Sequence, residues 1–156
     1  MKDMGIRGLK YLAIFLMLLL VGCSISPGFE FWHYEAEAPV ILSIDEAHDF
    51  CWQTISYVPD NGDVWQLPHE TLICGTGDCE DFSLLFMFLI YKNLGIESHL
   101  VRVDRGILGN HFLVRMENDR YYDPMVSFFK DMNLDERWKI LDVYNYGRAM
   151  FMALIR

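Results

Sequence analysis

The sequence predicts an α+β domain in which a central helix packs on a small antiparallel sheet. A long, almost continuously apolar helical segment occupies the middle of the chain, and short segments of strand character separated by turn residues follow it. The chain has 156 residues, of which 53% are hydrophobic and 22% are charged. This length suits one domain, and this composition excludes a disordered or low-complexity chain.

Capping signals mark the two main helices. Ser43 and Glu46 form a capping-box pattern, so we expect a helix over residues 44–57. Asp78 is placed as the N-cap of a second helix over residues 79–95. This second helix is apolar nearly all round, which predicts that it is central and covered on most sides.

Short strands follow the second helix. We expect strands over residues 98–104, 111–116 and 120–123, with turns over 106–110 and 117–119. These strands are close enough in sequence to form an antiparallel sheet packed on a helix.

Two weaker helical segments complete the chain, over residues 133–140 and 145–155. The apolar side chains of the last segment are most simply explained as cover for the core.

The first residues indicate export. Positive side chains precede an apolar run over residues 11–22, which is close in length to a signal-peptide core and too short to span a membrane. The run ends Leu-Val-Gly-Cys at Cys23, which resembles the lipobox of bacterial lipoproteins, so residues 1–22 are expected to be a lipoprotein signal peptide. Residues 23–42 are then the lipidated cysteine and a tether, and residues 43–156 form the domain. A plain secretory signal is the alternative, and Ser24 leaves the choice of membrane open.

The charge balance is acidic. Lys and Arg number 13 against 22 Asp and Glu, a formal net charge of −9, and removal of residues 1–22 leaves −11. Nucleic-acid binding needs a basic face, so no nucleic-acid partner is expected. Anionic headgroups would repel such a surface, so a lipid anchor would have to hold it at the membrane.

Three cysteines remain beside Cys23. An exported compartment permits disulfides, so Cys51 and Cys74 could form one, or each could be a small buried residue. A structural zinc site is not expected, because no second pair of ligands accompanies Cys74 and Cys79.

Cys79, His111 and Asp123 suggest a catalytic triad. A thiol at a helix N-terminus is favoured as thiolate, an imidazole can accept its proton, and a carboxylate can orient that imidazole. The helix dipole is worth only about 0.3–1 kcal/mol, which lowers a thiol pKa by less than one unit, so His111 must supply the rest.

One strand register brings His111 and Asp123 together. A two-residue loop between the last two strands would place their side chains on opposite faces of the sheet. A loop over residues 117–119 instead pairs Leu113 with Asp123 and places His111 diagonally on the same face. We therefore predict the three-residue loop or a bulge.

Carboxylates crowd the thiol. Asp78, Glu80 and Asp81 oppose ionisation of Cys79 unless they are turned away, paired or bound to a cation. They are explained either as favourable charge at a helix N-terminus or as a hard-cation site, with calcium held by Asp78 and Glu80.

These residues carry a resemblance to a known family. Residues 77–81 read Gly-Asp-Cys-Glu-Asp at a helix start, a histidine opens a later strand, and residues 122–124 read Tyr-Asp-Pro. Together they resemble the transglutaminase-like superfamily. Residues 65–71, Trp-Gln-Leu-Pro-His-Glu-Thr, are similar to a stretch of the bacterial transglutaminase-like cysteine proteinases. The resemblance covers about residues 44–125.

The resemblance implies a papain-like fold and a Cys-His-Asp triad. Cys79 would be the nucleophile, His111 the general base and then acid, and Asp123 the residue that orients it. Calcium would fall on Asp78 and Glu80, and no other cofactor is required. The separation of His111 and Asp123 is tighter than the family pattern.

The expected function is a membrane-anchored cysteine hydrolase, a peptidase or amidase that forms a thioester on Cys79. Its partner would be a protein or peptide substrate in the cell envelope. The Cys79 backbone N–H would be one oxyanion donor, and Trp52, Gln53 and Trp65 are candidates for a second donor or for substrate contact. The alternatives are a catalytically inert lipoprotein that serves as a binding or assembly module, and a protein-glutamine acyltransferase.

Overall fold

The computed structural model describes residues 38–62 and 64–155. The expected signal peptide, Cys23 and most of the tether lie outside the described residues. The chain divides into two units, Met1–Glu35 and Ala36–Arg156, and the second contains the domain. In the described part of the chain, no helix has the length and apolar character needed to cross a membrane.

Helix α2 (Ile44–Thr54) begins where the capping box predicts. The Ser43 hydroxyl accepts the Glu46 N–H at 3.1 Å, and the Glu46 carboxylate reaches back to the N–H of Leu42 at 2.8 Å. The helix ends three residues before the predicted end, because β1 (Ser56–Tyr57) pairs in parallel with β2 (Thr76–Gly77).

Helix α3 (Pro68–Cys74) was not predicted. Its signals are nevertheless in the sequence: Pro68 occupies the first helical position, where its missing N–H costs nothing. The Glu70 carboxylate accepts the N–H of Leu67 at 2.8 Å, and Gly75 ends the helix with a left-handed φ of 65°.

The predicted central helix is confirmed as α4 (Cys79–Leu94), with Asp78 as N-cap and Gly95 as C-cap. Its residues are buried without interruption from Glu80 to Ile90. Burial of large apolar side chains contributes about 1.5–3 kcal/mol each, so α4 is the main source of core stability.

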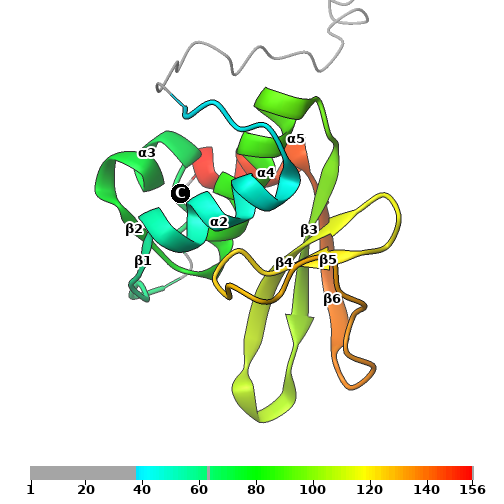
Figure 1. Cartoon of the computed structure of the whole chain (residues 1–156). Coiled ribbons are helices and arrows are strands. Elements are labelled where there is room, and N and C mark those ends of the chain that lie inside the picture. Colours follow the sequence, from blue (N-terminus) through cyan, green and yellow to red (C-terminus); the bar gives the residue numbers. More distant parts are fainter. Residues whose placement is uncertain (1–37, 63, 156) are drawn as a thin grey trace, which may run out of the picture. The chain divides into compact units, whose positions relative to one another are not determined.

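The sheet has four antiparallel strands in the order β5-β4-β3-β6. They are β3 (Ser98–Asp104), β4 (Asn110–Met116), β5 (Tyr121–Tyr122) and β6 (Lys139–Asn145). Figure 1 shows the helices beside the sheet and the β3–β4 hairpin extending beyond them.

Both faces of the sheet are covered. One face packs on α2, α4 and α5 through residues that include Leu100, Phe112 and Val114. The other face carries a smaller apolar cluster, which chain segments after β5 cover. Its members are Val101, Val103, Leu113 and Tyr121, with Phe129, Leu134, Trp138 and Val143 packed against them.

The predicted helix over residues 133–140 is wrong. Residues 133–138 form no helix, and β6 begins at Lys139 and pairs with the edge of β3, with an irregularity opposite Arg102 and Val103. A short apolar run suits a helix or a strand equally well, and the open edge of β3 decides in favour of a strand. The last predicted helix is present as α5 (Tyr146–Leu154).

The predicted register between β4 and β5 is confirmed. Val114 pairs with Tyr122 and Arg115 with Tyr121, and the Met116 N–H donates to the Arg120 carbonyl at 2.8 Å. Asp119 closes the three-residue loop with a left-handed φ of 57°.

Candidate active site

The described chain places Cys79 at the first residue of α4, directly after β2. The pairing of Tyr57 with Gly77 fixes the chain two residues before the thiol. Gly77 lies so close to Asp81 that an added Cβ would stand 2.7 Å from the Asp81 Cβ. The chain segment that precedes Cys79 is therefore fixed by its pairing with β1 and by its close contact with Asp81.

Replacing Gly77 with alanine should destabilise the domain and displace the Asp81 carboxylate. A contact of 2.7 Å to a buried side chain cannot form without movement, and overpacking of this kind costs about 1–3 kcal/mol. Urea unfolding of the variant measures the loss, with Gly147→Ala as control, because the nearest atom to an added Cβ there is 3.9 Å away. Equal unfolding midpoints for the two variants would contradict this expectation.

His111 and Asp123 form a buried hydrogen-bonded pair. The His111 Nε2 lies 2.6 Å from Asp123 Oδ2, and the two residues are 4% and 3% exposed. The pair forms because the register places both side chains on one face of the sheet. With Nε2 directed at the carboxylate, Nδ1 of His111 is the ring atom left to accept another proton.

Cys79 lies against the start of β4. The backbone N–H of Phe112, the residue after His111, faces the sulfur and favours its thiolate. One turn further along α4, the Ser83 hydroxyl donates to the Phe112 carbonyl at 3.4 Å. The thiol itself donates to Glu80 Oε2 at 3.2 Å, so its proton is held by the neighbouring carboxylate and not by His111 as expected.

The acidic residues beside the thiol are buried, and their burial and mutual repulsion change the pKa values of the site. Burial, followed by the charge of Glu80, raises the pKa of Cys79. Burial and the neighbouring Asp78 raise the pKa of Glu80 to about 8. Burial also raises the pKa of Asp78, against hydrogen bonds from Glu80 and the Asp60 backbone, and Asp78 Oδ1 is buried with no hydrogen-bond partner.

Asp81 has a structural role at this helix end. Its Oδ1 accepts the N–H of Gln66 at 2.7 Å, and its Oδ2 accepts the N–H of Asp78 at 3.1 Å. Burial raises its pKa to about 6. Since both oxygens are occupied by backbone donors, the pair open to a cation is Asp78 and Glu80. The oxygens of this pair and the Cys79 sulfur lie within 4.8 Å of one another.

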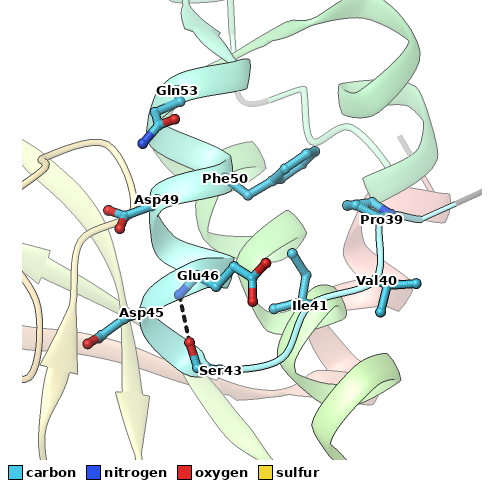
Figure 2. A pocket seen from close by; sticks show the side chains of 9 residues that line it. All are labelled: Pro39, Val40, Ile41, Ser43, Asp45, Glu46, Asp49, Phe50 and Gln53. Atoms are coloured by element: carbon cyan, nitrogen blue, oxygen red, sulfur yellow. Dashed lines mark hydrogen bonds between the residues drawn. The ribbon is translucent and has the colours of Figure 1, made fainter.

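The structure separates the three candidates for a second oxyanion donor. Trp65 is a core residue, 3% exposed, whose ring centroid lies 5.2 Å from that of Phe112 and 5.6 Å from that of Tyr144, both in T-shaped contacts. Trp52 is 45% exposed on α2. Gln53 lines a pocket of about 560 Å³ beside α2, whose lining contains no member of the triad (Figure 2).

Cys51 and Cys74 are free thiols in the structure. Cys51 is completely buried and Cys74 is exposed, so the bridge that the sequence allows is not formed. Burial raises the pKa of Cys51, which makes it an inert core residue.

Sequence reasoning missed Tyr57 and Asp60. Burial and then the charges of Cys79 and Asp78 raise the pKa of the Tyr57 phenol, which places it beside the site. Asp60 contributes a backbone hydrogen bond and negative charge at Asp78. The β1–β2 pairing brings both residues there, and no local pattern marks a pairing of two-residue strands.

Comparison with known proteins supports the fold. No protein-family profile matches the chain, and no characterised protein matches it in sequence. Two solved structures of LapG from Legionella pneumophila, one of them EGTA-treated, are similar to it with a TM-score of 0.57 and 20% identity. Each similarity covers 70% of this chain; it covers 65% of the EGTA-treated LapG chain and 67% of the other. The chain thus spans about two thirds of LapG, and it has the transglutaminase-like, papain-like fold.

Proposed function

We propose that this chain is an exported cysteine hydrolase that cleaves amide bonds through a thioester on Cys79. The observation that carries the proposal is the buried His111–Asp123 pair beside a cysteine at the N-terminus of α4. LapG, which shares the fold, is a periplasmic cysteine protease of the transglutaminase-like kind. This likeness in fold favours hydrolysis as the reaction.

The first half of the reaction forms the acyl-enzyme. The Cys79 sulfur attacks the carbonyl carbon, and His111 Nδ1 takes the thiol proton and passes it to the departing amine as the C–N bond breaks. Asp123 holds the imidazole by its Nε2–H and stabilises the imidazolium. The Cys79 backbone N–H, at the free end of α4, would donate to the oxyanion.

The second half releases the acid. Water attacks the thioester carbonyl carbon, His111 takes a proton from the water, and the proton returns to sulfur as the C–S bond breaks. The products are a carboxylic acid and the regenerated thiol. An amine in place of water would give transamidation, which incorporation of a labelled amine would reveal.

We also propose that Asp78 and Glu80 hold calcium. Their oxygens match the hard ligands that calcium prefers, and Asp78 Oδ1 is a buried acceptor without a partner. Backbone oxygens and water would complete the coordination. Bound calcium would neutralise the two carboxylates and so remove their opposition to the thiolate.

The test of the hydrolase is the reactivity of Cys79. The rate of alkylation by iodoacetamide is measured against pH by peptide mass, with calcium and with a chelator, on the full-length protein. With calcium we expect a plateau below about pH 7.5, as for an activated thiolate. Exposed Cys74 in the same sample serves as the reference thiol.

An ordinary profile with a midpoint near pH 8.5 in both conditions would count against the hydrolase. The inert binding module would then be the better explanation. The plateau would justify a search for a substrate among envelope proteins.

In the presence of a chelator, the free energy of unfolding of the domain should fall as the pH rises from 6 to 8. Burial and the neighbouring Asp78 raise the pKa of Glu80 from a usual 4.5 to about 8, so over this range the folded chain binds more protons than the unfolded chain. The free energy of unfolding therefore falls with rising pH. Glu80→Gln should remove most of this dependence of the free energy of unfolding on pH. Calcium should reduce the same dependence in the unaltered chain.

Thermal unfolding midpoints at pH 6 and pH 8, with chelator and with calcium, measure this effect. Glu97→Gln, at an exposed position between the end of α4 and the start of β3, is the matched control and should keep the slope. A calcium-independent midpoint at pH 8 would contradict the calcium proposal while leaving the triad intact.

The location of the enzyme is part of the proposal. We place it in the cell envelope, held by a lipid on Cys23, because the chain begins with a signal-like segment that ends in a lipobox-like sequence. Metabolic labelling with a fatty acid, compared between the unaltered chain and Cys23→Ala, tests the anchor. Equal labelling of the two would exclude lipidation at Cys23.

A further inference from the structure

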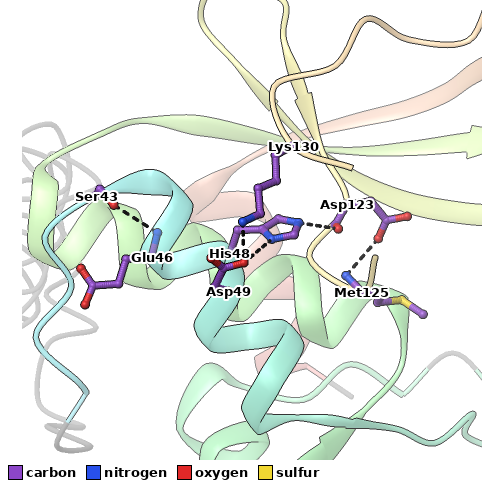
Figure 3. Close-up of polar contacts among 7 residues, drawn as sticks. All are labelled: Ser43, Glu46, His48, Asp49, Asp123, Met125 and Lys130. Carbon is purple, nitrogen blue, oxygen red and sulfur yellow. Dashed lines mark hydrogen bonds and ion pairs between the residues drawn. The ribbon is translucent and has the colours of Figure 1, made fainter. Parts of the chain in front are cut away.

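His48 is a buried histidine that the proposed mechanism leaves unused. It belongs to α2 but is 0% exposed. Its ring centroid lies 6.2 Å from that of Phe86 on α4 and 6.3 Å from that of Tyr122 on β5. Figure 3 shows the imidazole directed from α2 towards the chain that carries Asp123. Three separate elements therefore fix the position of this ring.

The hydrogen bond of His48 defines its protonation state. Its Nε2 lies 2.8 Å from the backbone carbonyl oxygen of Asp123. A carbonyl oxygen can only accept, so the proton is on Nε2. Burial lowers the pKa of His48, which favours the neutral ring, and Nδ1 is buried with no hydrogen-bond partner, with Asp49 Oδ1 3.8 Å away.

Local contacts set most of the conformation of Asp123. Its N–H donates to the Phe129 carbonyl at 2.9 Å, its carbonyl accepts the Val126 N–H at 3.0 Å, and its Oδ1 accepts the Met125 N–H at 3.1 Å. All of these partners belong to the loop that follows Asp123. They shape the loop, but they do not place it against the helices.

Helix α2 holds the loop over residues 123–130 in position against the helices. His48 holds its first residue, and the next residue of the helix, Asp49, forms an ion pair with Lys130 at the end of the loop. Two consecutive residues of α2 thus bind the two ends of the segment from Asp123 to Lys130. A shift at the first contact would turn the Asp123 carboxylate relative to His111.

We propose that His48 is a positioning residue, which fixes the backbone of Asp123 so that its carboxylate orients His111. This inference rests on the proposed function. It assigns to the Nε2–H of His48 a role that an apolar core residue of the same size could not fill.

Two substitutions separate the hydrogen bond from packing. His48→Leu removes the donor and keeps an apolar core, whereas His48→Gln keeps an N–H at the position of Nε2. With calcium at pH 7, we expect His48→Leu to slow alkylation of Cys79 about tenfold and His48→Gln to stay within about threefold of the unaltered chain. The downfield proton signal of the His111–Asp123 hydrogen bond should be lost in the first variant and kept in the second.

Two controls calibrate the result. Phe86→Leu loosens the packing around the same ring without removing its hydrogen bond, so it should lower the thermal midpoint and leave the alkylation rate unchanged. Asp123→Ala gives the rate when orientation of His111 is lost completely.

Each outcome separates the two proposals. If Asp123→Ala is slow and His48→Leu is as fast as the unaltered chain, the positioning role is wrong and the hydrolase stands. Equal slowing by His48→Leu and His48→Gln also overturns the role, because the amide would not have rescued it. If Asp123→Ala reacts at the unaltered rate, the triad itself fails.

A measurement on the unaltered chain covers the case in which His48→Leu does not fold. Nitrogen-15 shifts of labelled histidine report which ring nitrogen of His48 carries the proton. A neutral ring protonated on Nε2 supports the role, and a ring protonated on Nδ1 overturns it.

Discussion

Replacing His111 with alanine is expected to slow the reaction of Cys79 with iodoacetamide at pH 7 by about 100-fold with calcium present. The physical reason is that burial and Glu80 raise the pKa of the thiol, and the helix end is too weak to offset this. Removal of the imidazole leaves no group beside Asp123 to accept the proton and stabilise the thiolate. Hydrolysis of any peptide substrate should fall at least as far.

The matched control is His99→Ala. His99 lies on β3, the neighbouring strand, where it pairs with Arg115 and not with a member of the site. This variant should alkylate at the unaltered rate. If both histidine variants react alike, His111 does not activate Cys79 and the inert binding module gains support.

Replacing Asp81 with alanine is expected to lower the free energy of unfolding by roughly 3–5 kcal/mol. Asp81 is 2% exposed, and each of its oxygens accepts a backbone N–H, from Gln66 and from Asp78. Alanine would remove the acceptor of the buried Asp78 N–H and of the part-buried Gln66 N–H, and each loss of a hydrogen bond to a charged group costs about 1.5–3 kcal/mol. The first turn of α4 would loosen together with the chain that precedes Cys79.

Urea unfolding of Asp81→Ala, Asp81→Asn and Glu97→Ala measures this contribution. Asn keeps one acceptor oxygen, so the free energy of unfolding of Asp81→Asn should lie between those of the other two variants. Glu97→Ala removes an exposed carboxylate and should change stability by less than about 0.5 kcal/mol. A loss for Asp81→Ala no larger than that of Glu97→Ala would show that the two hydrogen bonds contribute little.

The fold could be predicted where local signals and burial agree. The capping residues Ser43 and Asp78 and the apolar run of α4 predicted two helices, and the three-residue loop predicted the β4–β5 register. Strand β6 could not be predicted, because its residues suit a helix as well as a strand until the edge of β3 is available. Helix α3 was missed although Pro68, Glu70 and Gly75 mark its ends.

Two geometric features of the candidate site could be predicted from the sequence. The contact between His111 and Asp123 follows from strand register, and the position of Cys79 follows from a helix start. The contributions of Tyr57 and His48 depend on how separate elements meet, so no local pattern could indicate them. The thiol of Cys79 donates to Glu80 because the buried Glu80 carboxylate is turned towards the sulfur, and residue identity alone does not indicate that orientation.

The hydrogen bond from Cys79 to Glu80 also bears on oxidative damage. Peroxides attack thiolates, and the first product, a sulfenic acid, proceeds to irreversible acids when no second thiol rescues it. Of the other two thiols in the described chain, Cys51 is completely buried in the apolar core and Cys74 is exposed, and neither forms a disulfide. Because the Glu80 carboxylate accepts the proton of the Cys79 thiol, we expect this thiol to react slowly with peroxides.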